Sequence, residues 1–274
     1  MKKILFFTAI FLPFMASPVP AQTGPASKIS SGSGFQSLEK RAFAGNAKGQ
    51  TDLGTAYYNG HGVTQDYKQA ILWYQKAASQ GYPVAQFYLG NAYLHGIGLQ
   101  QSDERAAFWY QKSANQGFAE AQYNLALAYY NGRGVAQNYD QAAFWYQRAA
   151  NQGSAPAQFY LGDMYRNGAG LPEDDQQAIF WYQKAADQGF AEAQYHLGLA
   201  YRDGTAVKKN EQQAVFWYQK AANQGHPAAE LNLGVSYLKG KGVTKDKEKA
   251  AFWLEKAADQ GDSNAQDLLQ MMNK

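Results

Sequence analysis

Apolar side chains recur along this chain at the spacing of an amphipathic helix. Ala70, Trp73, Tyr74, Ala77 and Ala78 occupy the i, i+3, i+4, i+7 and i+8 positions, so a helix here has one wide apolar face. The pattern therefore predicts a helix with one side buried against other helices.

A second apolar stripe lies on the next segment. Between Pro83 and His95, the residues Ala85, Leu89 and Tyr93 again keep helical spacing. Proline is tolerated in the first turn of a helix, so Pro83 is a suitable starting residue. The two segments together predict a pair of helices joined by short loops.

The predicted helix pair repeats with a fixed period. The chain has six tryptophans, and they are 36 residues apart without any insertion or deletion: Trp73, Trp109, Trp145, Trp181, Trp217 and Trp253. Such a period is typical of a solenoid, in which each unit stacks on its neighbours because it cannot bury its apolar face alone. The sequence therefore predicts one elongated array of stacked units.

Glycines and polar caps mark the ends of the predicted helices. A glycine that can close a helix in the left-handed conformation follows each first helix: Gly60, Gly96, Gly132, Gly168, Gly204 and Gly240. A good N-cap residue precedes each second helix: Asp66, Ser102, Asn138, Asp174, Asn210 and Asp246. Four of these caps have glutamine three residues later, which predicts a capping box. Ala206 replaces the second glycine of the turn in the fifth unit, so we expect an altered loop there.

These units resemble Sel1-like repeats, a subfamily of the tetratricopeptide-like solenoids. The family's motif has a Leu-Gly pair, a Tyr, a Gly-x-Gly turn, a polar cap, and an Ala-x-x-Trp-Tyr helix that ends in Ala-Ala-x-x-Gly. In the first unit these positions are Leu53, Gly54, Tyr57, Gly60, Gly62, Asp66, Ala70, Trp73, Tyr74, Ala77, Ala78 and Gly81. Ala126 and Leu254 are departures from the motif in later units. The resemblance implies an all-α, right-handed α/α solenoid of Sel1-like helix pairs.

The remaining segments complete the expected domain organisation. Residues 1–21 have the features of a bacterial Sec-type signal peptide, with a basic start, a short apolar run and a small-residue cleavage site after Ala21. We therefore expect a periplasmic or secreted protein with no membrane span after cleavage. A flexible Ser- and Gly-rich linker is expected at 22–34, followed by the solenoid at 35–274. The solenoid divides into half-repeats at 35–45 and 262–274 and six full units at about 46–81, 82–117, 118–153, 154–189, 190–225 and 226–261.

Charge and cysteine content narrow the range of functions. Without the signal segment, 23 basic residues stand against 22 acidic ones, a balance that does not favour nucleic-acid binding. The absence of cysteine excludes disulfides and a cysteine nucleophile. The four histidines are scattered and lack the spacing of a metal site. We expect neither a metal nor a cofactor.

The positions that differ most between units lie off the apolar stripe of the first helix. If the array curves as tetratricopeptide-like arrays do, these positions line its concave side. Repeated aromatics with Asn and Arg beside them suit capture of an extended peptide. The candidate partner-binding residues are Phe87, Asn91, Tyr123, Leu127, Tyr130, Asn131, Phe159, Arg166, Asn167, Tyr195 and Arg202. The alternative is that the aromatics only fill space between adjacent first helices.

A column of cations occupies the last turn of the second helices: Lys76, Lys112, Arg148, Lys184, Lys220 and Lys256. One interpretation is a ridge for an anionic surface such as phospholipid or a cell-wall polymer. The other is that these cations complement the helix dipole and need no ligand.

The resemblance implies a protein-interaction module or adaptor that binds an extended peptide or a protein partner. Cell-wall glycan, such as peptidoglycan, is an alternative ligand because aromatic columns also stack on sugars. Some cysteine-rich Sel1-like proteins are described as β-lactamases, and the pairs Ser37 with Lys40 and Ser236 with Lys239 match S-x-x-K. Neither K-T-G nor S-D-N accompanies these pairs, so we expect no catalytic residues.

Overall fold

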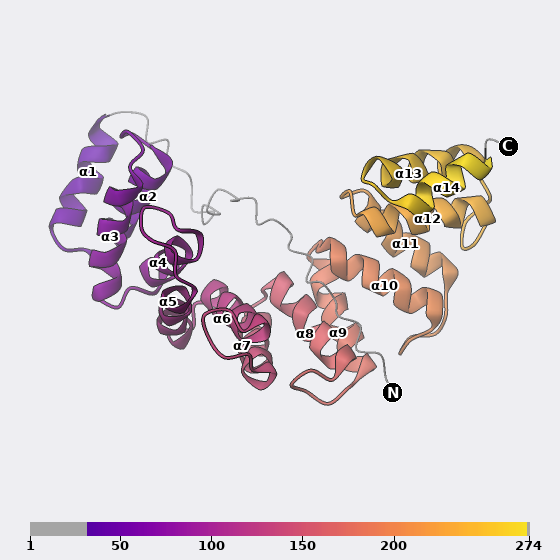
Figure 1. Ribbon diagram of the computed structural model, residues 1–274, viewed down its shortest axis with the longest axis horizontal. Coiled ribbons are helices and arrows are strands. Elements are labelled where there is room, and N and C mark those ends of the chain that lie inside the picture. The colour runs from indigo at the N-terminus through magenta and orange to yellow at the C-terminus, as the bar shows by residue number, and fades with distance from the viewer. Residues whose placement is uncertain (1–31, 273–274) are drawn as a thin grey trace.

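The computed structural model describes residues 32–272, which form fourteen α-helices and no strand (Figure 1). The predicted signal peptide and most of the predicted linker lie outside these residues. The first helix is α1 (Gly32–Phe43), which begins three residues before the expected half-repeat, and the last is α14 (Ser263–Met272). Six helix pairs lie between them: α2 (Ala47–Asn59) with α3 (Tyr67–Ser79), α4 (Pro83–His95) with α5 (Asp103–Asn115), α6 (Ala119–Asn131) with α7 (Tyr139–Asn151), α8 (Ala155–Asn167) with α9 (Asp175–Asp187), α10 (Ala191–Asp203) with α11 (Glu211–Ala222), and α12 (Pro227–Lys239) with α13 (Lys247–Asp259).

The helix pairs stack into an arc (Figure 1). Each helix packs against the helix before it and the helix after it in the chain, from α1 to α14. In this view α2, α4 and α6 lie toward the open side of the arc, and α3, α5 and α7 lie along its outer edge. The predicted all-α solenoid is therefore confirmed.

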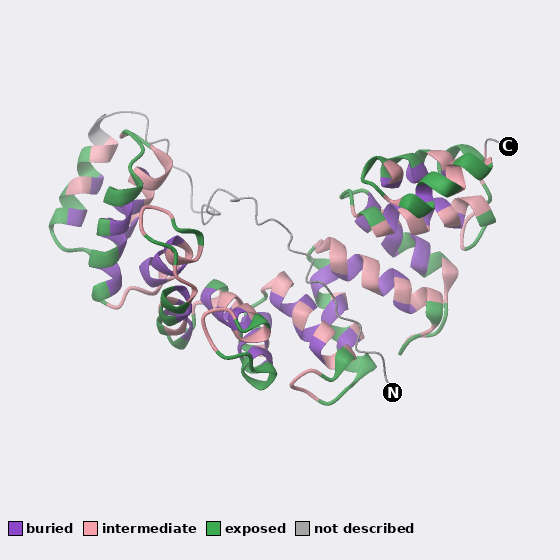
Figure 2. Ribbon diagram, in the orientation of Figure 1, coloured by how far each residue is buried: buried purple, intermediate pink, exposed green. Residues whose placement is uncertain are grey.

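The apolar stripes of the paired helices form the core. Five of the six tryptophans are buried, and Trp109 is half-buried, so the tryptophan column belongs to the core as predicted. Each buried tryptophan from the third unit onward shares a cluster with residues of the unit before it, as Trp217 does with Tyr182 and Ala185. Figure 2 shows the buried segments along the seams between helices and the exposed segments at the loops and the outer edge. The tryptophans therefore tie each unit to its neighbour.

Close approach within each pair depends on the Leu-Gly motif. A Cβ atom added at Gly54 would lie 2.7 Å from Cε1 of Tyr74, which is closer than real contacts allow. The equivalent glycines of α4, α8 and α10 face the tyrosine of their own second helix in the same way. Glycine at this position lets the two helices of a unit pack directly over the tyrosine ring.

The predicted helix ends are confirmed, with one correction. The side chain of each predicted N-cap accepts a hydrogen bond from the backbone three residues later, as Asp66 does from the N–H of Gln69 at 3.0 Å. The predicted capping box is wrong in its second half. The backbone N–H of Asp66 donates to the carbonyl of Tyr57, at 3.0 Å, and every later cap is held by the corresponding tyrosine carbonyl. This N–H is therefore already satisfied without the glutamine side chain.

The loop of the fifth unit differs as expected. Ala206 has φ 54°, the left-handed conformation that glycine adopts at the same place in the neighbouring units. Ala206 is exposed, whereas Gly170 and Gly242 are half-buried. A Cβ at either glycine would overlap the backbone of the preceding second helix, so an alanine does not fit at the glycine position. The alanine is thus accommodated by moving the turn outward.

We expect Ala206→Gly to raise the free energy of unfolding by about 1 kcal/mol. A left-handed conformation costs a residue with a Cβ roughly 1–2 kcal/mol, and the greater entropy of glycine in the unfolded chain offsets part of that gain. Urea titration followed by circular dichroism measures the change. Gly170→Ala is the matched control and should destabilise the protein, and equal stability of all three proteins would contradict this account.

A glutamine ladder connects successive helices and was not anticipated from the sequence. In the second unit, Gln86 Nε2 donates to the carbonyl of Ala78 on α3, and Gln86 Oε1 accepts from Gln116 Nε2 at the end of α5, at 2.8 Å. Each buried glutamine therefore joins three helices. The paired glutamines are Gln50 with Gln80, Gln86 with Gln116, Gln122 with Gln152, Gln158 with Gln188, and Gln194 with Gln224. In the sixth unit Glu230 takes the place of the buried glutamine.

Candidate interaction surface

The inner face comprises the residues of the six first helices, α2, α4, α6, α8, α10 and α12, that lie off the core stripe. All the candidate binding residues lie on these helices, but their exposure differs. Phe159 is buried, Asn131 and Asn167 are exposed, and the others are half-buried. The half-buried set is Phe87, Asn91, Tyr123, Leu127, Tyr130, Arg166, Tyr195 and Arg202.

The inner face has an aromatic residue at the same place in four successive units: Phe87, Tyr123, Phe159 and Tyr195. This aromatic column packs across the joints between units. The ring centroids of Phe87 and Phe118 are 5.2 Å apart, and Phe159 lies 5.3 Å from Phe190. Tyr195 stacks on the ring of His226 at 4.6 Å. These aromatic rings therefore pack between adjacent units. The inner-face positions beside them are more open to a partner.

A second set of inner-face residues accepts hydrogen bonds from the hydroxyl groups of buried tyrosines. Tyr110 Oη donates to Asn91 Oδ1 at 2.6 Å, and Tyr182 Oη donates to Asp163 Oδ1. Leu127 occupies the same place in the third unit, where the hydroxyl of Tyr146 has no hydrogen-bond partner among residues 32–272. Asn91 is therefore engaged inside its own unit.

A polar network lies at the junction of α8, α9 and α10. Arg166 pairs with Asp163 through Nη2 at 3.0 Å, and its Nη1 donates to His196 Nδ1, also at 3.0 Å. The ring of His196 also stacks on Tyr182, with the centroids 5.3 Å apart. The guanidinium is held in place by these two contacts while part of its surface stays open to solvent.

Burial sets the charge states in this network. Burial, with help from the Arg166 charge, lowers the pKa of His196 to about 3, so the ring is neutral near pH 7 and its Nδ1 can accept from Arg166. Burial raises the pKa of Asp163, and the Arg166 charge and the Tyr182 hydrogen bond oppose that rise. The network is thus a fixed ion pair beside a neutral imidazole.

Arg202 occupies the position of Arg166 one unit later. Its Nε and Nη2 donate to the two carboxylate oxygens of Asp203 at 2.7 and 2.8 Å, and its Nη1 donates to Asn232 Oδ1 at 3.4 Å. The hydrogen bonds from Arg202 lower the pKa of the Asp203 carboxyl. The inner face therefore presents two positioned guanidinium groups in successive units.

Sequence analysis did not identify one column of inner-face residues as part of the candidate site. Its members directly follow the aromatic column and are all half-buried: Asp52, Tyr88, Asn124, Tyr160, His196 and Asn232. His196 and Asn232 are the side chains that orient the two arginines. The available signal was that this column varies between units as much as the predicted columns do.

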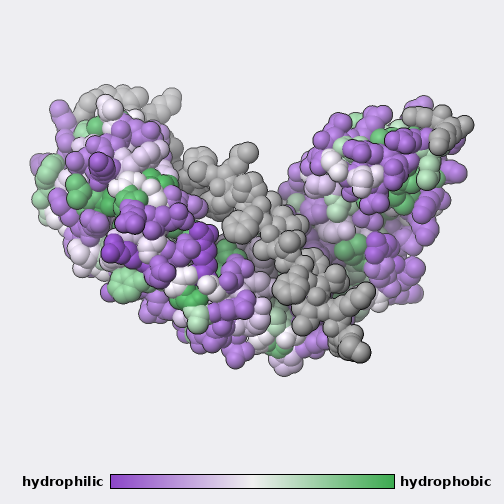
Figure 3. All heavy atoms as spheres, in the orientation of Figure 1, coloured by the Kyte–Doolittle hydropathy of each residue, from purple (hydrophilic) through white to green (hydrophobic). Residues whose placement is uncertain are grey.

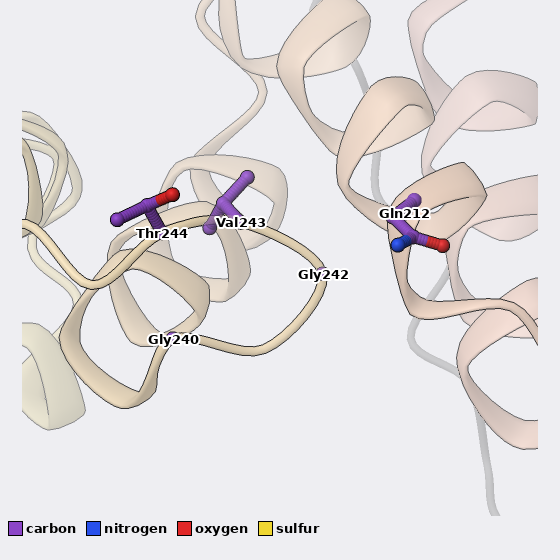
Figure 4. A pocket seen from close by; sticks show the side chains of 5 residues that line it. All are labelled: Gln212, Gly240, Gly242, Val243 and Thr244. Carbon is purple, nitrogen blue, oxygen red and sulfur yellow. The ribbon is translucent and has the colours of Figure 1, made fainter.

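The serines of the two S-x-x-K matches have different surroundings. Ser236 Oγ donates to the backbone carbonyl of Asn232 at 2.8 Å, and Ser37 lies exposed on the first helix. Residues 32–272 contain no group of three or more His, Asp or Glu side chains arranged to hold a metal ion. A hollow beside the α12–α13 loop, lined by Gln212, Gly240, Gly242, Val243 and Thr244, bears no charged or aromatic side chain (Figure 4).

None of the described helices is long and apolar enough to cross a membrane. A comparison with curated proteins gave no match.

Solved structures of similar proteins share this arrangement. A protective antigen of uropathogenic Escherichia coli strains, c5321, which displays an SLR fold, is 37% identical, with a TM-score of 0.83 over 86% of this chain and 50% of that chain. The present chain thus spans half the length of that protein. A Sel1 repeat protein from Oxalobacter formigenes is 34% identical, with a TM-score of 0.61 over 89% of this chain and 83% of that chain. The Cut9–Hcn1 complex of the APC/C contains a chain that is 16% identical with a TM-score of 0.54, which shows likeness of fold alone.

The family model for the Sel1 repeat matches six consecutive segments of the chain. They are residues 47–82, 83–118, 119–154, 155–190, 191–226 and 227–262. Each segment holds one first helix and one second helix of the arc. Sel1 repeats are protein–protein interaction modules. The chain therefore belongs to the Sel1 repeat family.

Proposed function

We propose that this protein is an exported bacterial adaptor that binds an extended segment of a partner protein along its inner face. Export is supported by the basic start and short apolar run of residues 1–21. Binding of a protein is supported by membership of a family of interaction modules. Fold alone does not define a partner, so the site has to be argued from its side chains.

The observation that carries the proposal is the pair of positioned arginines. Arg166 and Arg202 are held by internal hydrogen bonds, so little side-chain entropy is lost when they bind a partner. A guanidinium has five N–H donors, which leaves donors on Arg166 for the carbonyl or carboxylate oxygens of a peptide. Tyr130 stands at the same position one unit earlier and offers a half-exposed ring. Tyr and Arg are the residue types that dominate binding energy at protein interfaces.

We expect the double change Tyr130→Ala and Arg202→Ala to weaken capture of the partner by about tenfold or more. Both side chains are half-buried on the inner face, so their removal leaves the tryptophan core intact. The measurement is quantitative affinity capture from bacterial envelope extract, with the circular-dichroism signal of each protein checked first. Proteins bound by the parent and lost by the double variant identify the partner.

The matched control changes the outer edge of the arc instead. Phe108→Ala with Phe180→Ala removes two half-exposed rings from α5 and α9 and leaves the inner face unchanged. This control should capture the same proteins as the parent. Identical captures by the parent and the inner-face variant would contradict the proposed site.

A further inference from the structure

The second helices carry an outer ridge of apolar residues and cations. Each has one large apolar residue directed outward, immediately before the tryptophan of the unit, and one cation a helical turn later. The apolar members are between 45% and 54% exposed: Leu72, Phe108, Phe144, Phe180, Phe216 and Phe252. The cations are Lys76, Lys112, Arg148, Lys184, Lys220 and Lys256. The ridge therefore repeats one chemical unit from α3 to α13.

The cations of the outer ridge lie over aromatic rings. Lys220 Nζ is 4.7 Å from the ring centroid of Phe216, and the Arg148 guanidinium is 4.6 Å from that of Phe144. Lys112, Lys184 and Lys256 lie similarly over the phenylalanine of their own unit. Within residues 32–272, none of the six cations is within ion-pair distance of a carboxylate. Their stems are positioned on the rings while their charge remains available to an anion.

Polar amides run beside this row. Gln111 Nε2 donates to Asn115 Oδ1 at 2.8 Å, and Gln147 and Gln219 make the equivalent bond to Asn151 and Asn223. The second, third and fifth units thus offer a half-exposed ring, a positioned amide pair and a cation, whereas in the fourth unit Gln183 donates to the carboxylate of Asp187. The face drawn in Figure 3 is mostly hydrophilic, with hydrophobic side chains in small separate groups.

Packing does not require the phenylalanines. In the first unit Leu72 replaces the ring, and Lys76 still lies 4.0 Å from the ring centroid of Trp73. The tryptophan alone can therefore position the cation and complement the helix C-terminus. The five phenylalanines pack edge-to-face on the tryptophan beside them, yet about half of each side chain stays exposed. Exposed apolar groups repeated in one row indicate an interaction surface.

The regularity of the outer ridge indicates the kind of ligand. The inner face changes from unit to unit, as expected for recognition of one particular polypeptide. The outer ridge repeats phenylalanine, glutamine and a cation almost unchanged, which suits a ligand that is itself a regular polymer. Rings stack on the faces of sugars, amides bond hydroxyl groups, and cations pair with acidic substituents.

We propose that the outer ridge binds a linear acidic polysaccharide, in which sugars bear carboxylate groups at regular intervals. This site is distinct from the inner face and does not depend on the adaptor function. Stacking supplies preference for a sugar chain, and the cations supply preference for an acidic one.

The test uses the purified protein and polygalacturonate, a linear polymer with one carboxylate per sugar. The key variant is Phe108→Leu, Phe144→Leu, Phe180→Leu and Phe216→Leu, which copies Leu72 of the first unit and keeps every charge. We expect binding of the parent, and an affinity about tenfold or more lower for the leucine variant. Biolayer interferometry at physiological salt measures both affinities.

Two further variants keep the result interpretable. Lys112→Gln, Arg148→Gln, Lys184→Gln and Lys220→Gln together should weaken binding and flatten its dependence on salt, because fewer charges pair with the polymer. Tyr130→Ala on the inner face should bind as the parent does. The proposal is overturned if the leucine variant binds polygalacturonate as well as the parent, or if dextran binds equally well. It is also overturned if polyglutamate or phosphatidylglycerol vesicles bind more tightly than polygalacturonate.

Discussion

Trp145→Ala is expected to lower the free energy of unfolding by about 3–5 kcal/mol. Trp145 is only 5% exposed and lies at the middle of the array, where it packs in the same cluster as Tyr110 of the unit before it and Leu125 of its own unit. A buried tryptophan removes roughly 200 Å² from water, and the alanine leaves most of that volume as a cavity. This loss is a substantial fraction of the roughly 5–15 kcal/mol by which a typical domain is stable.

The position of Trp145 in the solenoid adds a second consequence. Stability in such arrays is close to a sum of unit terms and nearest-neighbour interface terms, so a weakened interface in the middle separates the units before it from those after it. We therefore expect the single urea transition of the parent to divide into two. Circular dichroism over a urea titration measures both the midpoint and the number of transitions.

Phe144→Ala is the matched control for this change. Phe144 is the adjacent residue of α7, is 45% exposed, and its ring lies 4.9 Å from that of Trp145. Its removal should cost less than about 1 kcal/mol, because the side chain is already half in water. A similar loss for both variants, or a loss below about 1 kcal/mol for Trp145→Ala, would show that the tryptophan does not hold the units together.

The repeat, the helix ends and the tryptophan core could be predicted because they follow from short-range rules. The bounds of α4, at Pro83 and His95, follow from a proline in the first turn and a glycine that closes the last. Burial of Trp145 follows from its place on the apolar stripe. Such features depend on residues within one or two turns of each other, so a single unit is sufficient to recognise them.

Contacts between units could not be predicted in the same way. The link between Gln86 and Gln116 joins residues 30 apart in the chain, and nothing in helix propensity or polarity distinguishes them from exposed glutamines. The Arg166 to His196 contact has the same separation. Pairings of this kind depend on how neighbouring units are placed in three dimensions.

The glutamine ladder is interrupted in the sixth unit, where Glu230 replaces the buried glutamine. Glu230 is 2% exposed on α12, and its Oε2 accepts a hydrogen bond from Gln260 Nε2 at 2.8 Å. In the other units the glutamine at this place also donates to a carbonyl eight residues earlier, which here is that of Ala222. An ionised carboxylate has no proton to donate, so Glu230 makes only half of the ladder's contacts while its charge is buried.

Glu230→Gln is therefore expected to raise the free energy of unfolding by about 1–3 kcal/mol at pH 7, because it restores the donor and removes a buried charge. Burial raises the pKa of Glu230 above its ordinary value of 4.5, and the Gln260 hydrogen bond and the Lys256 charge oppose that rise. A carboxyl with a raised pKa in the folded state binds its proton more tightly there than in the unfolded chain. The native protein is thus favoured below the ordinary pKa, and this stabilisation is lost as the pH rises through the raised value. The Glu230→Gln variant has no titrating carboxyl at this position. The difference in the free energy of unfolding between this variant and the parent should therefore shrink as the pH falls toward about 4.

The converse change provides the control. Gln194→Glu places a carboxyl at the equivalent position of α10, where Gln194 now donates to Ala186 and accepts from Gln224. It should destabilise the protein at pH 7 by an amount similar to the gain from Glu230→Gln, and the loss should recover on acidification. Urea titrations from pH 4 to pH 8, with hydrogen exchange of the α11–α13 amides, measure the size and the location of both effects. A buried charge that destabilises the protein must lose this effect when the carboxylate is protonated. If the stability difference between Glu230→Gln and the parent is the same throughout this range, the charge of Glu230 does not destabilise the packing of the sixth unit.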